Sequence, residues 1–272
     1  MNNTLLHYKA LLFDVDNTLS CSHTAITPTV QSALQLLHQQ KYHIGLCTGR
    51  HFAQLKVNFL PFFPNDSLHI VSGGTQVITT MGKILWSQHI PGETVLRLYA
   101  KATAENMGFI THDGEHSYAN EHVFKVISEE KDDSFYPQFL PVEKLSTWST
   151  PAVVAWGYTP GFVEFLNSHS QDLTYKTMVS RAHGPYIDIT PHGVTKVTGI
   201  QHYCEMIGIS PSEIIGFGDS DNDEEFLRTV GFPVAMGNAT DTIKALASRV
   251  IGSCDNDGLG IYLPQILAGA EL

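Results

Sequence analysis

The sequence predicts an α/β protein in which a doubly wound parallel sheet carries a second, inserted α+β domain. Short apolar segments alternate with amphipathic helical segments near both ends of the chain, which is typical of strand–helix–strand units around a parallel sheet. In the middle of the chain the order of elements becomes mixed. The 272 residues are enough for two ordinary domains. We therefore expect a core at residues 1–82 and 185–272 and an inserted domain at 83–184.

The first strand is predicted at Lys9–Val15, where a short apolar run ends in two carboxylates. These are Asp14 and Asp16, separated by one residue. Open α/β sheets bind their ligands at the carboxyl ends of the strands, so the pair is a candidate site. Taken alone, the same residues are equally well explained as a polar turn after a strand.

A helix and a second strand follow. Thr27 is a candidate N-cap with Pro28 at the first helical position, and apolar residues recur at helical spacing at Val30, Ala33, Leu34 and Leu37. The segment Tyr42–Cys47 is apolar enough for a buried strand and ends at Thr48, Gly49 and Arg50. A further helix is expected over Phe52–Phe59.

The pattern changes after a third strand at Leu68–Val71, first to hairpin-like alternation around Met81-Gly82. Within the insertion we expect helices at Glu93–Met107 and Gly161–Ser168. Short strands are expected at Phe109–Thr111, Ser117–Ala119, Val153–Trp156 and Leu173–Val179.

Strands and helices alternate again after Tyr186. An apolar stripe predicts a helix that ends at Gly208, a favourable residue after a helix C-terminus, and the stripe consists of Val197, Ile200, Cys204 and Ile207. Ile214–Phe217 is then a strand that runs into the acidic segment GDSDND, residues 218–223. The first domain thus resumes after the insertion.

The composition is that of a globular protein, with 43% hydrophobic and 16% charged residues. A formal net charge of −11 argues against a surface that binds nucleic acid or an anionic membrane. No secretory signal is recognisable, and no apolar run approaches ~18 residues. We expect a cytoplasmic protein.

Four cysteines are scattered along the chain, at Cys21, Cys47, Cys204 and Cys254. No two of them have the C-x-x-C spacing of a zinc site, and nothing suggests a disulfide framework. The simplest expectation is four reduced thiols.

Polar groups fall at strand ends or at a helix start of the predicted core, namely Asp14 with Asp16, Thr48, Lys196, and Asp219 with Asp223. Each has a structural explanation on its own. Thr48 suits a helix cap, Lys196 a solvated charge, and the acidic run the first turn of a helix. Their order on one α/β scaffold favours a single site.

In these motifs the chain resembles the haloacid dehalogenase-like (HAD) superfamily of phosphohydrolases. The motifs are DVDNT at Asp14–Thr18, CTGR with Thr48, ITPHGVTK with Lys196, and GDSDND with Asp219 and Asp223. The stretches IVSGGTQVI, DITPHGVTKVTGI and VAMGNATDTIKALASRVIGSCDNDGLG are similar to the Cof-type subfamily, whose α/β (C2B-type) cap is inserted between motifs two and three. The cap matches in placement and size more than in residues. Asn17 departs from the family, which usually has glycine there, but asparagine tolerates the same unusual backbone angles.

The resemblance implies phosphoryl transfer, in which catalysis consists mainly of positioning and charge neutralisation. Asp14 matches the nucleophile that forms an aspartyl-phosphate, and Asp16 the general acid and base. Asp14, Asp219 and the backbone carbonyl of Asp16 would supply oxygens to Mg2+. Asp223 is expected to hold Lys196 or the shell around the metal.

Other residues of the motifs are expected around the phosphate. Thr48 and Lys196 match donors to its nonbridging oxygens, and Lys196 also offsets the repulsion that raises the pKa of Asp14. Gly49 and Asn222 are expected beside them. For Arg50 two roles stay open, which are bidentate recognition of the phosphate and pairing with surface carboxylates.

In the cap, candidates to contact the leaving group are Asp113, His116, Tyr118 and Arg181. The combined expectation is a Mg2+-dependent phosphomonoester hydrolase acting on a small phosphorylated metabolite, with a sugar phosphate as the favoured class. Two alternatives stay open on the same core residues. One is a sugar phosphomutase, and the other is a non-catalytic module that binds a ligand or a protein.

Overall fold

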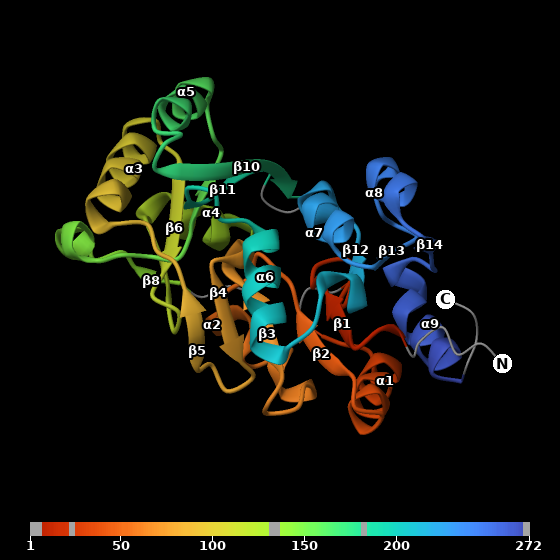
Figure 1. The fold of residues 1–272 in the computed structure, drawn as a ribbon. Helices are drawn as coiled ribbons and strands as arrows, with labels where there is room; N and C mark the ends of the chain where they lie inside the picture. Colours follow the sequence, from red (N-terminus) through yellow and green to blue (C-terminus); the bar gives the residue numbers. More distant parts are fainter. Residues whose placement is uncertain (1–6, 22–24, 131–136, 181–183, 269–272) are drawn as a thin grey trace. The chain divides into compact units, whose positions relative to one another are not determined.

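A computed structural model describes residues 7–21, 25–130, 137–180 and 184–268 (Figure 1). These residues form two compact units. The first consists of the described residues within Met1–Arg50, Leu55–Trp86 and Lys196–Leu272, and the second of those within His51–Gln54 and Ser87–Thr195. The units change after residues 86 and 195, whereas the domain boundaries expected from the sequence lie after 82 and 184.

The first unit is built on a parallel sheet. Its strands, in spatial order, are β14 (Arg249–Val250), β13 (Phe232–Ala235), β12 (Ile214–Gly218), β1 (Ala10–Phe13) and β2 (His43–Leu46). Each neighbouring pair is parallel. Phe13 of β1 lies opposite Phe217 of β12 and Leu46 of β2. The carboxyl ends of the three strands therefore meet at one edge, directly before the polar motifs.

Helices cover both faces of this sheet, and they are α1 (Pro28–Gln39), α6 (Lys196–Ile207), α7 (Glu224–Thr229), α8 (Asp241–Leu246) and α9 (Gly258–Leu267). On one face, Ala10 and Leu12 share a core with α6, α7 and α8. On the other, Phe13 stacks on Phe217, whose ring meets Tyr262 of α9, and α9 packs on α1. Alternate side chains of β1 thus enter opposite layers. The predicted doubly wound core is confirmed.

A smaller three-stranded sheet extends the first unit beyond β2. Its strands are β3 (Leu68–Val71), β4 (Gln76–Thr79) and β5 (Ile84–Ser87), and β3 runs antiparallel to β4. The N–H of Thr48 donates to the carbonyl of Ile70 in β3 (3.0 Å). In addition, the N–H of Leu46 donates to Nδ1 of the buried His69 (3.2 Å). Both bonds hold the end of β2, where the second motif begins.

The second unit has a sheet of its own, with the spatial order β10 (Leu173–Ser180), β11 (Gly184–Pro191), β9 (Val153–Trp156), β6 (Gly108–His112), β7 (Ser117–Ala119) and β8 (Gln138–Phe139). Neighbours are antiparallel except β7 and β8. Helices α3 (Gly92–Ala104) and α5 (Pro160–Ser168) pack on one face, and α4 (Glu121–Glu130) packs on the other. This unit is the predicted inserted α+β domain.

Most of the helices and strands expected from the sequence are present. Thr27 is the N-cap of α1, where its Oγ1 accepts the N–H of Val30 (3.4 Å). The helix expected at Phe52–Phe59 is shorter, since α2 ends at Leu55 and a separate 3-10 turn, Leu60–Phe62, contains Pro61. Among the described residues, no helix has the length and apolar character needed to cross a bilayer.

The expectation of four reduced cysteines is wrong. Cys21 and Cys254 form a disulfide between residues 233 positions apart, with their Cα atoms 5.7 Å from each other. Cys47 and Cys204 are free thiols buried in the core of the first unit. No sequence spacing signals the disulfide, because its cysteines meet only when the segment after β1 packs beside the segment before α9.

Candidate active site

The acidic residues of the first and last motifs meet at the carboxyl edge of the parallel sheet. Asp14 directly follows β1, and its N–H donates to the carbonyl of Phe217 in β12 (2.9 Å). Asp219 directly follows β12. Because β1 and β12 are neighbours in register, carboxylates from opposite ends of the chain come together.

Lys196, the first residue of α6, joins two of the carboxylates. Its Nζ lies 2.9 Å from Oδ1 of Asp14 and 2.6 Å from Oδ1 of Asp223. The lysine side chain is 4% exposed, and those of Asp14 and Asp223 are 5% and 0% exposed. A buried charge is tolerated only when it is paired and hydrogen-bonded. The solvated role that the sequence left open for Lys196 is therefore excluded.

Asp223 is held from both of its oxygens. Oδ1 accepts from Lys196, while Oδ2 accepts from the N–H groups of Asp219 (3.1 Å) and Ser220 (3.2 Å). Gly218 makes room for this arrangement, since a Cβ there would lie 2.8 Å from the Asp223 carboxylate. Asp223 thus fixes both the lysine and the loop that carries Asp219.

Burial and mutual repulsion shift the titration of the cluster. Burial, followed by the charge of Asp223, raises the pKa of Asp14 well above its usual value, and Lys196 partly offsets the rise. Burial and Asp223 also raise the pKa of Asp219 to about 7. Burial alone would lower the pKa of Lys196, but Asp14 and Asp223 raise it. The lysine therefore stays charged and favours the ionised form of Asp14.

Arg50 pairs with Asp16, a carboxylate of the first motif, and its recognition of a phosphate stays a prediction. Its Nε donates to Oδ2 of Asp16 (2.9 Å) and its Nη2 to Oδ1 (2.6 Å). The guanidinium also lies over the ring of Phe59, 5.1 Å from the centroid. A bidentate pair of this kind fixes the direction of both side chains.

The donor set fits a divalent cation. One carboxylate oxygen from each of Asp14, Asp219 and Asp223 lies within 4.8 Å of the others. When ionised, the site's four carboxylates carry four negative charges against two positive charges on its lysine and arginine, a net of −2. Hard oxygen ligands and an excess of negative charge are what Mg2+ requires. Since Asp223 already accepts three hydrogen bonds, Asp14 and Asp219 are the better ligands.

The remaining core candidates lie on the same motifs. Thr48 is 1% exposed and its Oγ1 accepts the N–H of Arg50 (3.1 Å). Gly49 lies between these two residues. Asn222 is the middle residue of the 3-10 turn Asp221–Asp223 that leads into α7. Their contacts with a phosphate stay a prediction.

The turn after Asp16 has the expected unusual backbone. Asn17 has φ 57°, in the left-handed region that glycine and asparagine adopt most readily. The hydroxyl of Thr18 donates to Oδ1 of Asp219 (3.3 Å), and Nδ2 of Asn238 donates to the carbonyl of Asn17 (2.9 Å). Thr18 and Asn238 were not identified from the sequence as site residues, although both lie within the quoted motifs.

Three cap candidates lie close together, Asp113 and His116 in the turn between β6 and β7 and Tyr118 in β7. Oδ1 of Asp113 accepts the N–H groups of Glu115 (2.9 Å) and His116 (2.8 Å), and Oδ2 accepts the hydroxyl of Tyr118 (2.8 Å). Although burial opposes the change, these bonds lower the pKa of Asp113. The fourth candidate, Arg181, lies outside the described residues.

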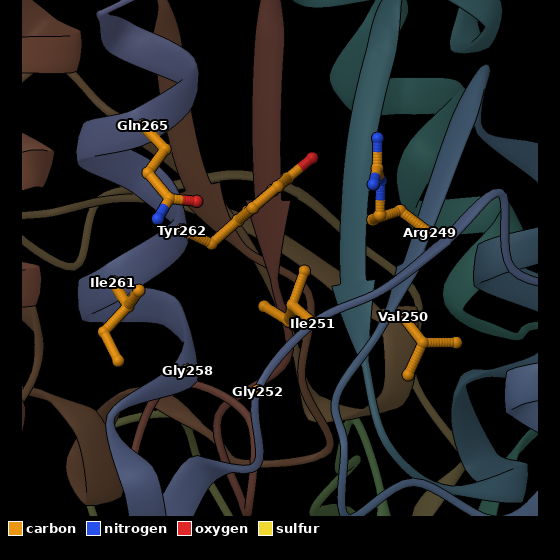
Figure 2. Close-up of a pocket in the computed structure, with 8 residues that line it drawn as sticks. All are labelled: Arg249, Val250, Ile251, Gly252, Gly258, Ile261, Tyr262 and Gln265. Carbon is orange, nitrogen blue, oxygen red and sulfur yellow. The ribbon is translucent and has the colours of Figure 1, made fainter. Parts of the chain in front are cut away.

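A cavity of about 240 Å³ lies elsewhere in the first unit, between α9 and the segment that includes β14 (Figure 2). It is lined by Arg249, Val250, Ile251, Gly252, Gly258, Ile261, Tyr262 and Gln265. None of the charged residues of the acidic cluster lines it. We therefore assign it no part in the chemistry of the cluster.

Known proteins resemble this chain along almost its whole length. Residues 11–263 match the family described as haloacid dehalogenase-like hydrolase. The HMP-PP phosphatase of Serratia proteamaculans is 25% identical over 289 residues, which cover 97% of each chain. The solved structure of the HAD subclass IIB sugar phosphatase BT4131 is 26% identical, with a TM-score of 0.76, and the match covers 94% of this chain and 98% of that one.

The fold is shared more widely. The phosphatase BT1666 from Bacteroides thetaiotaomicron superimposes with a TM-score of 0.78 at 22% identity, over 96% of each chain. The inserted domain is therefore part of the common architecture. Because the family match spans both units and the expected motifs meet at one sheet edge, the chain belongs to the haloacid dehalogenase-like hydrolases and is a phosphatase of the Cof type.

Proposed function

We propose that this phosphatase is a Mg2+-dependent phosphomonoester hydrolase that acts on a small sugar phosphate through a phosphoaspartate at Asp14. The observation that carries the proposal is the buried ammonium of Lys196, 2.9 Å from Asp14 and 2.6 Å from Asp223. It favours an ionised nucleophile and offsets the repulsion between that nucleophile and an anionic phosphate.

The reaction has two steps. A carboxylate oxygen of Asp14 attacks phosphorus, the bond from phosphorus to the ester oxygen breaks, and Asp16 gives a proton to the leaving oxygen. Water then attacks the phosphoaspartate, Asp16 takes a proton from the water, and inorganic phosphate leaves. Thr48 and Lys196 donate hydrogen bonds to the nonbridging oxygens in both steps, with Gly49 and Asn222 beside them.

Arg50 holds the side chain of Asp16 before substrate binds. Both oxygens of Asp16 accept from the guanidinium, so the carboxyl is directed at Arg50 and has to turn away before it can give a proton to the leaving oxygen. The substrate phosphate is a competing bidentate partner for Arg50. Substrate binding therefore releases the general acid at the moment when it is needed.

Asp14, Asp219 and the main-chain carbonyl of Asp16 would hold Mg2+, which would supply charge neutralisation and orientation of the phosphate. Asp223 has a different task. Its three hydrogen bonds from Lys196, Asp219 and Ser220 keep the lysine and the Asp219 loop in place around the metal.

The relatives support the substrate class. One of them is named as a sugar phosphatase and another as an HMP-PP phosphatase, so small phosphorylated compounds are hydrolysed on closely similar folds. At 25–26% identity about three quarters of the aligned positions differ, so the relatives support a class of substrate and not a particular compound. We therefore assign the class, a sugar phosphate, from the relative that matches in both sequence and structure.

The test is release of inorganic phosphate from a panel of hexose phosphates, pentose phosphates, an aryl phosphate and a diphosphate ester, with Mg2+ and with EDTA. We expect Mg2+-dependent release, fastest from a sugar phosphate and at least about 1000-fold slower in Asp14→Asn, because the nucleophile is lost. The matched control is Asp66→Asn, because Asp66 is an exposed carboxylate of the same unit. This variant should keep full activity.

Two outcomes would contradict the proposal. Full activity of Asp14→Asn would remove Asp14 as the nucleophile. Conversion of one sugar phosphate into its isomer without release of phosphate would replace hydrolysis by phosphomutase chemistry. A fastest rate on the diphosphate ester would leave the mechanism intact and correct the substrate class.

A further inference from the structure

The loop of residues 236–240, after β13, contacts both acidic loops of the site. The N–H of Met236 donates to the carbonyl of Gly218 (3.1 Å), and the N–H of Thr240 donates to that of Asp219 (3.0 Å). Between them, Asn238 reaches the other acidic loop, where its Nδ2 donates to the carbonyl of Asn17 (2.9 Å). One short loop therefore connects the segments that carry Asp16 and Asp219.

The amide of Asn238 is used at both ends. Its Oδ1 accepts the N–H of Cys254 (2.8 Å), while its Nδ2 donates to Asn17. A carbonyl can only accept and an N–H can only donate, so a single orientation of the amide satisfies both partners. Cys254 is in turn bonded covalently to Cys21, just past the same turn. The side chain of Asn238 is therefore held in one orientation between the Asn17 turn and Cys254.

Asn238 binds the turn at Asn17, the residue of the turn with the least favourable backbone conformation. Asn17 has φ 57°, a conformation that a non-glycine residue keeps only when its surroundings hold it. The N–H of Asn17 is bonded within the turn, to the carbonyl of Ser20 (2.9 Å). Its carbonyl is held from outside the turn, by Asn238. Because the N–H and the carbonyl of Asn17 are both held, the backbone of Asn17 is fixed, and with it the direction from which the preceding residue, Asp16, extends its side chain.

We propose that Asn238 is a positioning residue for Asp16. By fixing the carbonyl of Asn17, it holds the turn in the geometry from which the Asp16 carboxyl reaches the leaving oxygen. This inference rests on the proposed function, in which Asp16 is the general acid. It also gives a role to the GNA sequence at residues 237–239, which the proposed mechanism does not use.

The kinetic test compares Asn238→Ala and Asn238→Asp on two substrates of the wild-type enzyme, an alkyl phosphate and an aryl phosphate with an acidic phenol as leaving group. When the general acid is displaced, hydrolysis of the alkyl ester slows far more than hydrolysis of the aryl ester, because only the alkyl leaving oxygen needs the proton. We expect kcat for the alkyl ester to fall by about 10- to 100-fold, the range for a misplaced catalytic group. For the aryl ester we expect a fall of less than about threefold, with KM little changed.

The two substitutions separate positioning from loop stability. Asn238→Asp keeps an acceptor for the N–H of Cys254 but sets a carboxylate oxygen against the carbonyl of Asn17. Its kcat should therefore fall at least as much as that of Asn238→Ala. Asn256→Ala is the control, because Asn256 donates to Ser253 (3.0 Å) in the Cys254 segment without touching the Asn17 turn. It should leave the ratio of alkyl to aryl rates unchanged.

Hydrogen exchange of the metal-free protein gives a second readout that needs no substrate. Loss of the Asn238 amide should speed exchange in peptides covering residues 14–20, whereas Asn256→Ala should not. The positioning role would be overturned if Asn238→Ala slowed hydrolysis of both esters equally. It would also be overturned if folded Asn238→Ala exchanged amide hydrogens at residues 14–20 at the wild-type rate. If the wild-type enzyme hydrolyses no ester at all, the proposed function fails instead, and the exchange data still report whether Asn238 holds the turn.

Discussion

The acidic cluster of the first unit and the acidic turn of the second contain the same kind of side chain in opposite electrostatic settings. In the cluster, burial and neighbouring carboxylates raise the pKa values of Asp14 and Asp219. In the turn, burial is outweighed by hydrogen bonds from His116 and its neighbours, which lower the pKa of Asp113. The cluster is assembled from segments that are far apart in sequence, whereas every donor to Asp113 lies within five residues of it.

The difference separates a reactive group of charges from a structural one. Donors of its own turn supply hydrogen bonds to both oxygens of Asp113, so the ionised form of Asp113 stabilises the folded chain. With all four carboxylates ionised the site carries a net charge of −2, and burial and mutual repulsion, which raise the pKa values of Asp14 and Asp219, oppose that state. Groups whose ionised form is destabilised by the fold are characteristic of active sites, because binding of a cation and a substrate stabilises that form.

The largest effect that would sharpen this comparison is expected from Lys196→Met. The substitution removes the cation between Asp14 and Asp223 and leaves two buried carboxylates without a positive charge to pair with. We expect the free energy of unfolding to fall by about 3–5 kcal/mol, and kcat/KM to fall by about 1000-fold, as for the loss of a key donor to the transferring group. Urea denaturation and phosphate release measure the two effects.

The exposed Lys56→Met is the matched control and should change neither quantity. A second substitution tests the cause. Adding Asp223→Asn to Lys196→Met removes one uncompensated buried charge, so the double variant should recover part of the lost stability without recovering activity. A double variant less stable than Lys196→Met would show that the carboxylate of Asp223 is stabilised mainly by the N–H groups of its loop.

A smaller effect, with stability and activity changing in opposite directions, is expected from Asp219→Asn. The pKa of Asp219 is about 7 in the folded chain, against its usual 3.8. Between these values the folded form holds a proton that the unfolded form releases, so this part of the stability is lost as the pH rises from about 4 to about 7. In EDTA at pH 8 the variant should therefore unfold at higher urea than the wild type, and the difference should shrink towards pH 4.

The same substitution removes a proposed metal ligand, so activity at fixed Mg2+ should fall by about 100-fold or more. Asp221→Asn, two residues along the same loop and exposed, should retain activity. An Asp219→Asn enzyme with wild-type activity and an unchanged Mg2+ requirement would exclude Asp219 from the metal site. An unchanged pH dependence of stability would mean that the carboxylate is better solvated than its burial indicates.

The sequence predicted those elements that carry their own periodicity. The strands Leu68–Val71, Ser117–Ala119 and Val153–Trp156 have the expected bounds, because a short apolar or alternating run between turn residues specifies a strand locally. Helix α4 and strand β11 were not predicted. Helix α4 does carry an apolar face of its own, since Val123, Phe124 and Ile127 pack on the second face of the cap sheet, so it was predictable from its sequence. Strand β11, in contrast, depends on pairing with β10 and β9.

The site was predictable to the same degree. The residue types and order of the motifs identify Asp14, Lys196, Asp219 and Asp223, and the strand order then brings them together. The sequence could not specify the bonds that join one motif to another. Thr18 with Asp219 and Asn238 with Asn17 are pairs more than 200 residues apart, and each depends on the direction of a single side chain.

The smallest effect, and the one that most directly tests the comparison, is expected from the turn of the second unit. Asp113→Ala removes an acceptor of three local hydrogen bonds and should lower stability by about 1 kcal/mol, as for the loss of a capping side chain. Since the pKa of Asp113 is lowered on folding, its charge-dependent contribution is present above pH 3.8 and lost as the pH falls through the folded value.

Asp113→Asn is the matched variant, because it keeps Oδ1 for the N–H groups of Glu115 and His116 but loses the charge. At pH 7 its stability should lie between those of the wild type and Asp113→Ala, and its difference from the wild type should shrink as the pH falls below 3.8. With both oxygens of Asp113 engaged by its own turn, we expect kcat and KM to change by less than about twofold, as for substitutions away from a reacting centre. A tenfold rise in KM in both variants would instead restore Asp113 as the substrate contact that the sequence predicts, and the distinction between a reactive cluster and a structural turn would then fail.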